Sequence, residues 1–223
     1  IATGAVVLHY FAGFGGGRKS IVPGIAGLDT IAHNHALNLH PIEDRLDPAV
    51  RIGALDGNPV AEDMLEAARY AEVDFVINTV LNREGQIAGL FCGELEAAHR
   101  SAAEFARKVF AAPFKQRADF VIASAGGAKN FVQCHKALFN SYQTIKPGGR
   151  IIFAARSPEG FGNDQFARWM ALGSRKTIIA ELRQHAEING QTALSVTEKA
   201  PSAILITDLT SEQAATLGAQ KAH

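Results

Sequence analysis

The stretch His9-Tyr10-Phe11-Ala12-Gly13-Phe14-Gly15-Gly16-Gly17-Arg18-Lys19-Ser20 decides how this sequence is interpreted. It follows the apolar run Ala5–Leu8, which is typical of a buried strand, and it places four glycines within five positions. Glycines after a strand let the backbone approach a ligand closely and leave N–H groups free to bind an anion. The sequence therefore predicts a strand that runs into a ligand-binding turn.

Two phosphate-binding motifs come close to this stretch, and both fail at Arg18. The pattern G-x-x-x-x-G-K-[ST] has Lys19 and Ser20 in place but Arg18 at the position of its second glycine. The dinucleotide pattern G-x-G-x-x-G fails at the same residue. An ordinary ATP or GTP loop is therefore disfavoured, and a purely structural glycine turn with a solvated Lys19 stays open as the alternative.

Apolar runs suited to strands recur along the chain, at residues 5–8, 75–80, 120–123, 151–155 and 203–206. They are continuous rather than alternating, which is typical of parallel sheets covered on both faces. Helical patterns separate several of them, at about residues 59–71, 94–109, 130–145, 164–172, 176–185 and 212–217. Strands that alternate with helices predict an α/β fold whose buried sheets are largely parallel.

The polar, proline-containing segment Ala112–Arg117 is the expected boundary between two domains, residues 1–113 and 114–223. At roughly 150 residues per domain, the length allows one large domain or two small ones. The segment separates a helix from a new series of strand, helix and strand, and for this reason we place the boundary there.

Composition excludes several classes of partner. The 22 basic and 22 acidic residues give a formal net charge of zero, so we expect neither nucleic acid nor a membrane as a partner. Two cysteines do not form a disulfide framework, and neither a signal peptide nor a membrane-length apolar run is visible, which together favour the cytoplasm. Because a strand pattern begins a few residues after Ile1, we expect the natural chain to start upstream.

Four of the eight histidines lie early, at positions 9, 33, 35 and 40. His9 ends a predicted strand, where α/β proteins place ligands. His33 and His35 are separated by one residue, so in an extended chain they point the same way. Two histidines do not make a zinc site, which usually needs three or four ligands. A metal whose other ligands come from a cofactor would need only one protein histidine.

A second candidate group lies on the predicted helix after Ala125-Gly126-Gly127. Gln133 and Lys136 are spaced i, i+3 and therefore share a face, off the apolar stripe that runs through Phe131 and Leu138. One interpretation is a solvated polar face. The other is a helix start that presents a donor pair to an anionic substrate.

Three segments together resemble the nickel-dependent lactate racemase family, whose members carry the nickel-pincer nucleotide. They are HYFAGFGGGRKSIVPGIAGLDTIAHNH (9–35), DGNPVAEDMLEAARYAEVDFVINTVLN (56–82) and SAGGAKNFVQCHKAL (124–138). The likeness extends over most of the chain and is strongest at residues 10–35. It implies that residues 1–113 are the rear part of an N-terminal catalytic and cofactor domain, incomplete here, and that residues 114–223 are a C-terminal α/β domain.

The resemblance also implies roles for single residues. His9 matches a general acid/base on the substrate hydroxyl, Lys19 the lysine that joins the cofactor through a thioamide, and His35 the nickel ligand. Gln133 and Lys136 match residues that contact the substrate, so the expected catalytic residues are His9, Gln133 and Lys136. The implied cofactor is nickel(II) pyridinium-3,5-bisthiocarboxylic acid mononucleotide, which holds nickel through one ring carbon and two sulfurs and leaves the fourth planar position to a histidine.

The implied activity is that of an isomerase, a racemase or epimerase of a small 2-hydroxy acid such as lactate. A neutral histidine can take the hydroxyl proton near pH 7 while hydride passes from the α-carbon to the cofactor, and Lys136 can hold the carboxylate. Enzymes that build the cofactor are expected partners. The family's second catalytic histidine and a substrate arginine have no counterpart here, so we expect a C-terminal portion of a longer enzyme that does not racemise alone.

Two positions depart from the family pattern. The family has a tryptophan near the cofactor, late in its chain, whereas the only tryptophan here is Trp169. His135, between Gln133 and Lys136, is also unusual. These departures leave open which 2-hydroxy acid is the substrate.

Two other functions are compatible with parts of the sequence. Ile145–Phe153 looks like the late turn and strand of a methyltransferase, but the acidic-x-G-x-G loop that binds the methyl donor is missing. A non-catalytic cofactor-binding remnant is the other alternative. The presence of His9, Lys19 and His35 together argues against it.

Overall fold

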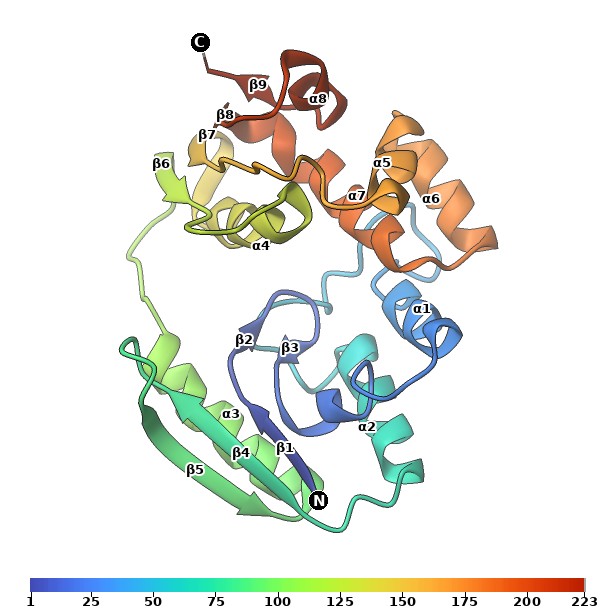
Figure 1. Cartoon of the computed structure of the whole chain (residues 1–223), viewed down its shortest axis with the longest axis vertical. Helices are drawn as coiled ribbons and strands as arrows, with labels where there is room; N and C mark the ends of the chain where they lie inside the picture. Colours follow the sequence, from blue (N-terminus) through green and yellow to red (C-terminus); the bar gives the residue numbers. More distant parts are fainter. Residues whose placement is uncertain (223) are drawn as a thin grey trace. The chain divides into compact units, whose positions relative to one another are not determined.

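The computed structural model of the protein describes residues 1–222, and the chain divides into two compact units, Ile1–Pro113 and Phe114–His223 (Figure 1). The division falls inside the segment Ala112–Arg117, where the sequence places a domain boundary. No helix in the described part of the chain combines the length and the apolar character needed to cross a membrane. That the two units are domains of a longer enzyme stays a prediction.

The sheet of the first unit has three strands in the order β1-β4-β5. They are β1 (Ala2–Ala5), β4 (Val76–Leu81) and β5 (Ile87–Gly93). β1 is parallel to β4, whereas β5 returns antiparallel after a turn in which Gly85 has φ +78°. The α/β class is confirmed, and this sheet is mixed rather than wholly parallel. The sequence does not predict β5, because alanine and glycine interrupt its apolar residues.

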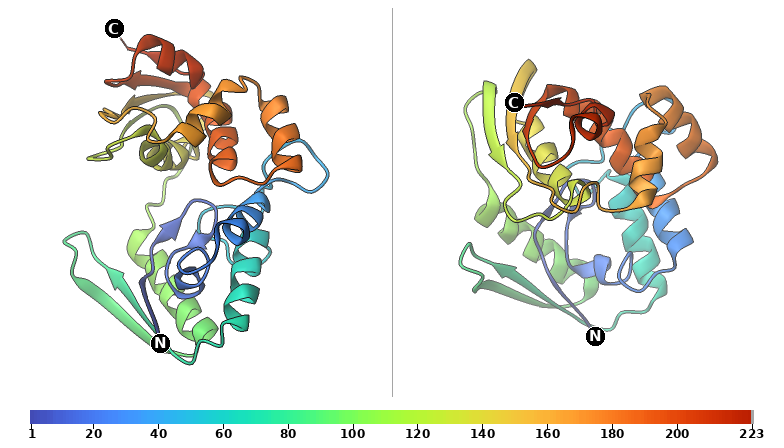
Figure 2. Two further views of the ribbon diagram at one scale, coloured as in Figure 1. Left: turned by 45° about the vertical axis from the view of Figure 1, so that its right-hand side comes forward. Right: turned by 45° about the horizontal axis from the view of Figure 1, so that its top comes forward.

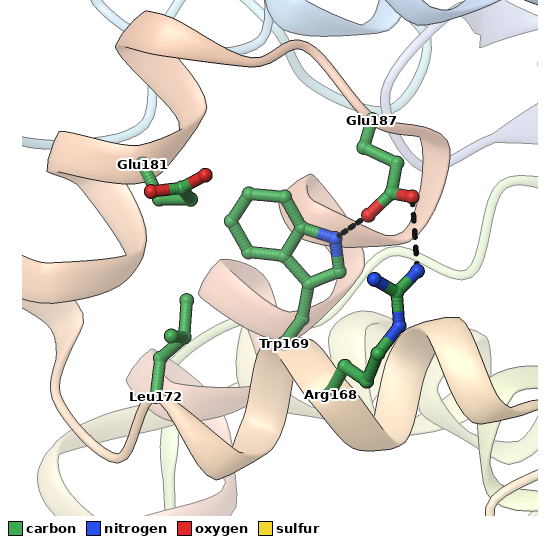
Figure 3. A pocket seen from close by; sticks show the side chains of 5 residues that line it. All are labelled: Arg168, Trp169, Leu172, Glu181 and Glu187. Carbon is green, nitrogen blue, oxygen red and sulfur yellow. Dashed lines mark hydrogen bonds and ion pairs between the residues drawn. The ribbon is translucent and has the colours of Figure 1, made fainter.

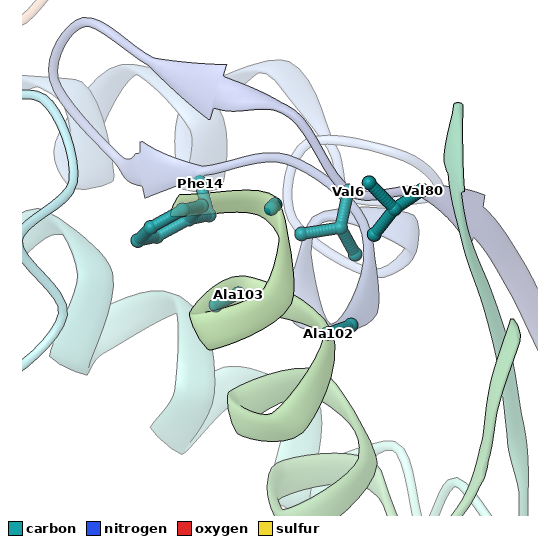
Figure 4. Packing of buried hydrophobic residues seen from close by; sticks show 6 residues of the cluster. Val6, Phe14, Val80, Ala102 and Ala103 are labelled. Atoms are coloured by element: carbon teal, nitrogen blue, oxygen red, sulfur yellow. The ribbon is translucent and has the colours of Figure 1, made fainter. Parts of the chain in front are cut away.

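Two helices pack in this unit, α2 (Pro59–Tyr70) and α3 (Leu95–Phe110). Asn58 caps α2, with Oδ1 accepting from the Ala61 N–H, and its Nδ2 donates to the Phe11 carbonyl oxygen at 2.7 Å. α3 lies along β4 and β5 (Figures 1 and 2). Figure 4 shows the resulting core, in which the small side chains of α3 let it approach the larger ones; its labelled residues are Val6, Phe14, Val80, Ala102 and Ala103.

The glycine stretch folds back on itself. β2 (Leu8–His9) pairs antiparallel with β3 (Gly13–Phe14), and a 3-10 turn, η1 (Gly17–Ser20), and a helix, α1 (Leu28–Ala36), follow. The strand expected at residues 5–8 is therefore split, because β1 ends at Ala5 and β2 begins at Leu8. At Gly13, where φ is +74°, an added Cβ would lie 1.9 Å from the Ala54 carbonyl oxygen. This turn therefore requires glycine.

The second unit contains a four-stranded parallel sheet in the order β6-β7-β8-β9. The strands are β6 (Ala118–Ser124), β7 (Ile145–Ala154), β8 (Ala203–Ile206) and β9 (Gln220–Lys221). The helical elements are α4 (Phe131–Tyr142), α5 (Asp164–Ala171), α6 (Arg175–Gln184), α7 (Ile188–Lys199), the 3-10 turn η2 (Ala200–Ser202) and α8 (Ser211–Thr216). The sheet confirms the expected α/β class.

Three features of this unit differ from the sequence-based expectation. Residues 146–149, which follow the helix expected at about residues 130–145, lie inside β7, where the pairing with β6 shifts register. α7 was not predicted, because glycine, serine and threonine in it are poor helix formers. One face of the sheet exposes Phe120, Ile122 and Ile206, at 70%, 82% and 53%, although continuous apolar runs predicted cover on both faces.

Candidate functional site

Three of the predicted site residues gather around the ring of Phe11 in the first unit. The imidazoles of His9 and His35 approach that ring edge-on, with centroid distances of 4.6 Å and 4.7 Å. Lys19 Nζ lies 5.4 Å from the centroid of Phe11 and 3.5 Å from Nε2 of His9. His9 and His35, which are 26 positions apart in the sequence, therefore both lie beside Phe11.

The hydrogen bonds of His9 restrict where its proton lies. The Ala12 N–H donates to Nδ1 of His9 at 3.2 Å. A neutral imidazole has one acceptor nitrogen and one N–H, so this contact assigns the proton to Nε2, the atom that faces Lys19. In the other tautomer, with the proton on Nδ1, Nε2 can accept a hydrogen bond from the Lys19 ammonium group at 3.5 Å. The two contacts of His9 therefore favour different tautomers.

His35 lies in α1, and its side chain is half-buried. Burial, and after it the positive charge of Lys19, lowers the pKa of His35 to about 4, against an opposing effect of the Ile31 carbonyl. Its Nδ1 is enclosed and has no hydrogen-bond partner among residues 1–222. His35 is therefore neutral at pH 7, which is the form of imidazole that binds a metal.

His33 does not accompany His35. The expectation that the two point the same way in an extended chain is wrong, because residues 28–36 form a helix. On a helix, residues two positions apart do not share a face. His33 is exposed, and its Nδ1 lies 2.7 Å from the carbonyl oxygen of Asp29.

Two buried polar residues that the sequence analysis missed hold the glycine turn. The Gly17 N–H donates to Oδ1 of Asn78 at 2.9 Å, and Nε2 of His99 lies 2.9 Å from the carbonyl oxygen of Gly15. A Cβ added to Gly17 would lie 2.4 Å from Cδ2 of His99, so the imidazole packs directly on the glycine backbone. Asn78 is a polar residue within an otherwise apolar strand, and this position in the sequence could have indicated a buried hydrogen bond.

The first unit fits a metal only if a cofactor supplies other ligands. No group of three or more His, Cys, Asp or Glu side chains that could hold a metal ion exists in the part of the chain described here. His35 offers a neutral imidazole with an enclosed nitrogen, and Lys19 offers an amine that can form a covalent bond. Imidazole suits nickel, so these residues fit a nickel-bearing group joined to the protein.

Gln133 and Lys136 lie on α4 in the second unit. Both side chains are exposed, and Lys136 Nζ donates to Oε1 of Gln133 at 2.8 Å, as expected for residues on one helical face. His135 between them is buried, its Nδ1 bonds to the carbonyl oxygen of Val132, and burial lowers its pKa to about 4. The unusual histidine is therefore part of the interior and does not lie beside the exposed pair.

The backbone at the start of α4 is not free to bind an anion. The Phe131 N–H donates to the carbonyl oxygen of Gly160 at 3.0 Å, and the Val132 N–H donates to that of Phe161 at 3.1 Å. The Gln133 N–H donates to Oδ1 of Asn130, the N-cap residue. The expectation that Gln133 and Lys136 present a donor pair to the substrate therefore rests on their side chains and stays a prediction.

Trp169 occupies a different part of the second unit. It lines a cavity of about 140 Å³ with Arg168 and Leu172, and Figure 3 shows Glu187 receiving hydrogen bonds from the indole N–H and from Arg168. Neither Gln133 nor Lys136 lines this cavity. The only tryptophan therefore has a structural partner within the helices of its unit.

Comparisons with known proteins agree with the resemblance. Residues 1–45 match the model of the lactate racemase N-terminal domain. The chain is 38% identical over 172 residues to the lactate racemase of Thermoanaerobacterium thermosaccharolyticum, covering 76% of this chain and 39% of that protein. It is 38% identical over 169 residues to the lactate racemase of Lactiplantibacillus plantarum, covering 74% of this chain and 38% of that protein. The chain thus spans about two fifths of the length of these relatives.

Solved structures show the same relationship. The lactate racemase apoprotein from Thermoanaerobacterium thermosaccharolyticum matches 99% of this chain with a TM-score of 0.86 and 31% identity, and the match covers 54% of that protein. A protein from Thermotoga maritima also matches 99% of this chain, with a TM-score of 0.75, and the match covers 59% of that protein. At 17% identity, this likeness concerns the fold alone. From sequence and structure together, this chain belongs to the lactate racemase family.

Proposed function

We propose that this chain is the C-terminal portion of a racemase that interconverts the enantiomers of a small 2-hydroxy acid such as lactate. One observation carries the proposal: His9, Lys19 and His35 gather around Phe11 in a chain that is 38% identical to lactate racemases. Because the chain spans about two fifths of those relatives, the activity belongs to the full-length protein, and this portion alone should not racemise.

Lys19 and His35 are the residues that would hold the cofactor. Lys19 would join it covalently through a thioamide, whose N–H can donate to Nε2 of His9 when that imidazole carries its own proton on Nδ1. His35 would ligate nickel as the neutral imidazole that its lowered pKa provides. When bound, the nickel-pincer nucleotide supplies an acceptor for the hydride of the substrate α-carbon.

His9 would transfer the proton of the substrate hydroxyl. To accept that proton at Nε2, the imidazole must carry its own proton on Nδ1, so the contact between Nδ1 and the Ala12 N–H has to open. This contact measures 3.2 Å, longer than a typical N–H hydrogen bond, and it lies within the turn itself. Proton transfer at His9 is therefore coupled to the conformation of residues 9–12.

Gln133 and Lys136 would bind the substrate. Lys136 carries the positive charge that a carboxylate requires, and Gln133 fixes its ammonium group through the 2.8 Å hydrogen bond. Since the backbone N–H groups at the start of α4 are occupied, the carboxylate would depend on the Lys136 side chain. A held carboxylate keeps the planar 2-keto acid in place while either face receives hydride.

The proposal also includes cytoplasmic location and dependence on the enzymes that build the cofactor. Its test is racemisation of L-lactate by the full-length protein, produced together with those enzymes and assayed by chiral analysis. The substitution His9→Gln should lower kcat by roughly 10²-fold or more. The substitution His33→Gln should leave kcat unchanged, because His33 is an exposed residue of α1. Full-length protein that contains nickel but does not interconvert 2-hydroxy acids would contradict the proposal and favour a non-catalytic cofactor-binding remnant.

A further inference from the structure

One face of the sheet in the second unit is apolar and lacks cover. Ile122 of β6 pairs with Ile152 of β7, which in turn pairs with Ile204 of β8. Side chains at paired positions of neighbouring strands point to the same face, so these three isoleucines form a row across the sheet. Phe120 and Ile206 extend the same exposed face at its two ends. The sheet therefore presents a continuous apolar surface.

The opposite face of this sheet is packed. Ile151 and Phe153 of β7 and Leu205 of β8 alternate with the residues of the row, and each is fully buried. On the covered side, α4 packs against β6 and β7 and also contacts α7. The contrast between the two faces is therefore a property of the whole sheet.

The order of the strands explains why only one face is covered. The four parallel strands follow one another in chain order, β6-β7-β8-β9. Crossover connections between parallel strands are right-handed, so connections that all proceed in one direction place their helices on one face. Helices reach the other face only when the sheet also grows in the opposite direction, beyond the free edge of β6.

The free edge of β6 suits a further strand. Among residues 1–222, β6 pairs only with β7, and it lies at one edge of the sheet (Figure 1). Strands that remain at an edge usually carry proline or several charges, which prevent pairing with other chains. The sequence of β6 contains no proline and one charged residue, Asp119, which accepts a hydrogen bond from Lys146 of β7 at 2.9 Å. Little in β6 opposes pairing on its free side.

We propose that a strand and a helix from the part of the full-length protein outside this chain complete the sheet. The strand lies parallel to β6 on its free side, and the helix packs over the row Ile122, Ile152 and Ile204. A right-handed connection to such a strand places its helix on the uncovered face, and parallel sheets occur almost only with both faces covered. The inference goes beyond the proposed function and holds whether or not the protein racemises.

The length of the relatives supports this occupant. The match to the lactate racemase apoprotein covers 54% of that protein, whereas a strand, a helix and a second strand together take roughly 30 residues. The full-length polypeptide therefore has ample chain for the missing layer. A second copy of the protein could also cover an apolar face, and the mass of a cross-linked product distinguishes it.

Photochemical cross-linking of the full-length protein tests the proposal. Phe120→p-benzoylphenylalanine places a photoreactive analogue of phenylalanine on the uncovered face. Tyr70→p-benzoylphenylalanine is the matched control, since Tyr70 is an aromatic residue at the end of α2 with 82% exposure. We expect the Phe120 variant to cross-link, at the mass of one polypeptide, to a peptide outside residues 1–223, and the control not to cross-link to that peptide.

Three cross-linking results would overturn the inference. A product with the mass of two polypeptides would assign the face to a second copy. A cross-link confined to residues 1–223 would show that this chain covers its own sheet. Irradiation without any cross-link would show that the face lies in solvent.

Thermal unfolding of the full-length protein provides a second, independent measurement. Ile122→Thr keeps a β-branched side chain that strands accept, so its effect reports on burial of the side chain. Under a packed helix this substitution should lower the Tm by about 4 °C. Ile42→Thr is the control, because Ile42 is 86% exposed, and it should shift the Tm by less than about 1 °C. Equally small shifts in the two variants would contradict the proposed cover.

Discussion

Nζ of Lys19 lies 3.5 Å from Nε2 of His9, ten residues earlier in the chain. The hairpin of β2 and β3 turns the chain back between them, and the 3-10 turn η1 then places Lys19 beside the imidazole. The Ala12 N–H donates to Nδ1 of His9 at 3.2 Å, so both ring nitrogens of this histidine have a neighbour within the turn. The relationship links the two residues whose roles matter most in the proposed reaction.

The glycine turn that carries Lys19 should not tolerate a side chain at Gly17. There φ is +51°, and a Cβ would lie 2.4 Å from Cδ2 of His99, so Gly17→Ala is expected to lower the free energy of unfolding by about 2 kcal/mol or more. Urea denaturation of the full-length protein measures it. Gly27→Ala is the matched control, because nothing lies within 4 Å of its added Cβ, and it should change stability by less than about 1 kcal/mol. Equal effects at the two positions would contradict the packing described.

His99 should make stability depend on pH. Burial, and after it the charge of Arg18, lowers its pKa from 6.5 to about 4 in the folded protein. Between these values the unfolded chain binds a proton that the folded chain does not, so the stabilisation is complete above about pH 6.5 and falls as pH drops, by about 1.4 kcal/mol per unit.

The variant His99→Gln removes this titration and keeps an amide that can donate to the Gly15 carbonyl oxygen. Urea unfolding at pH 7.5, 6.0 and 4.5 should therefore show a shallower pH dependence for His99→Gln than for the natural protein. His33→Gln serves as the control, since His33 is exposed on α1. The same pH slope in His99→Gln and the natural protein would show that His99 is not held neutral by burial.

Lys136 should contribute to catalysis through its charge. Removing one charge-assisted hydrogen bond to a carboxylate costs about 1.5–3 kcal/mol, so Lys136→Gln should lower kcat/KM for lactate by roughly 10- to 100-fold. Lys129→Gln is the control, because Lys129 is an exposed cation just before α4 with Nζ 3.9 Å from Glu159. If the two variants lose activity equally, the effect belongs to the general charge of this surface and not to Lys136.

The sequence predicts the parts of the fold whose signals are local. Asn58 and Pro59 mark the start of α2 through a cap and a proline that the first turn tolerates, and the structure places that start at Pro59. The regular spacing of apolar residues likewise predicts the helix α3. The spacing of Gln133 and Lys136 likewise predicts that they share a face, since α4 has the expected helical period.

Features that depend on tertiary contacts could not be predicted in this way. α1 lacks a capping side chain, so nothing local showed that His33 and His35 are on a helix. α7 contains poor helix formers, and tertiary packing outweighs their low helix propensity. The packing is close, since a Cβ on Gly190 would lie 2.4 Å from Leu182. The approach of Phe11 to His9 and His35 likewise depends on a hairpin and a helix that meet only in the folded unit.

Attachment of the cofactor to Lys19 is the central claim, and peptide mass analysis tests it most directly. The full-length protein is produced with the cofactor-building enzymes, its nickel content is measured, and the peptide that contains Lys19 is weighed. We predict a mass increment on that peptide and nickel in stoichiometric amount, both absent from Lys19→Met. Protein that racemises lactate while its Lys19 peptide is unmodified would contradict the claim.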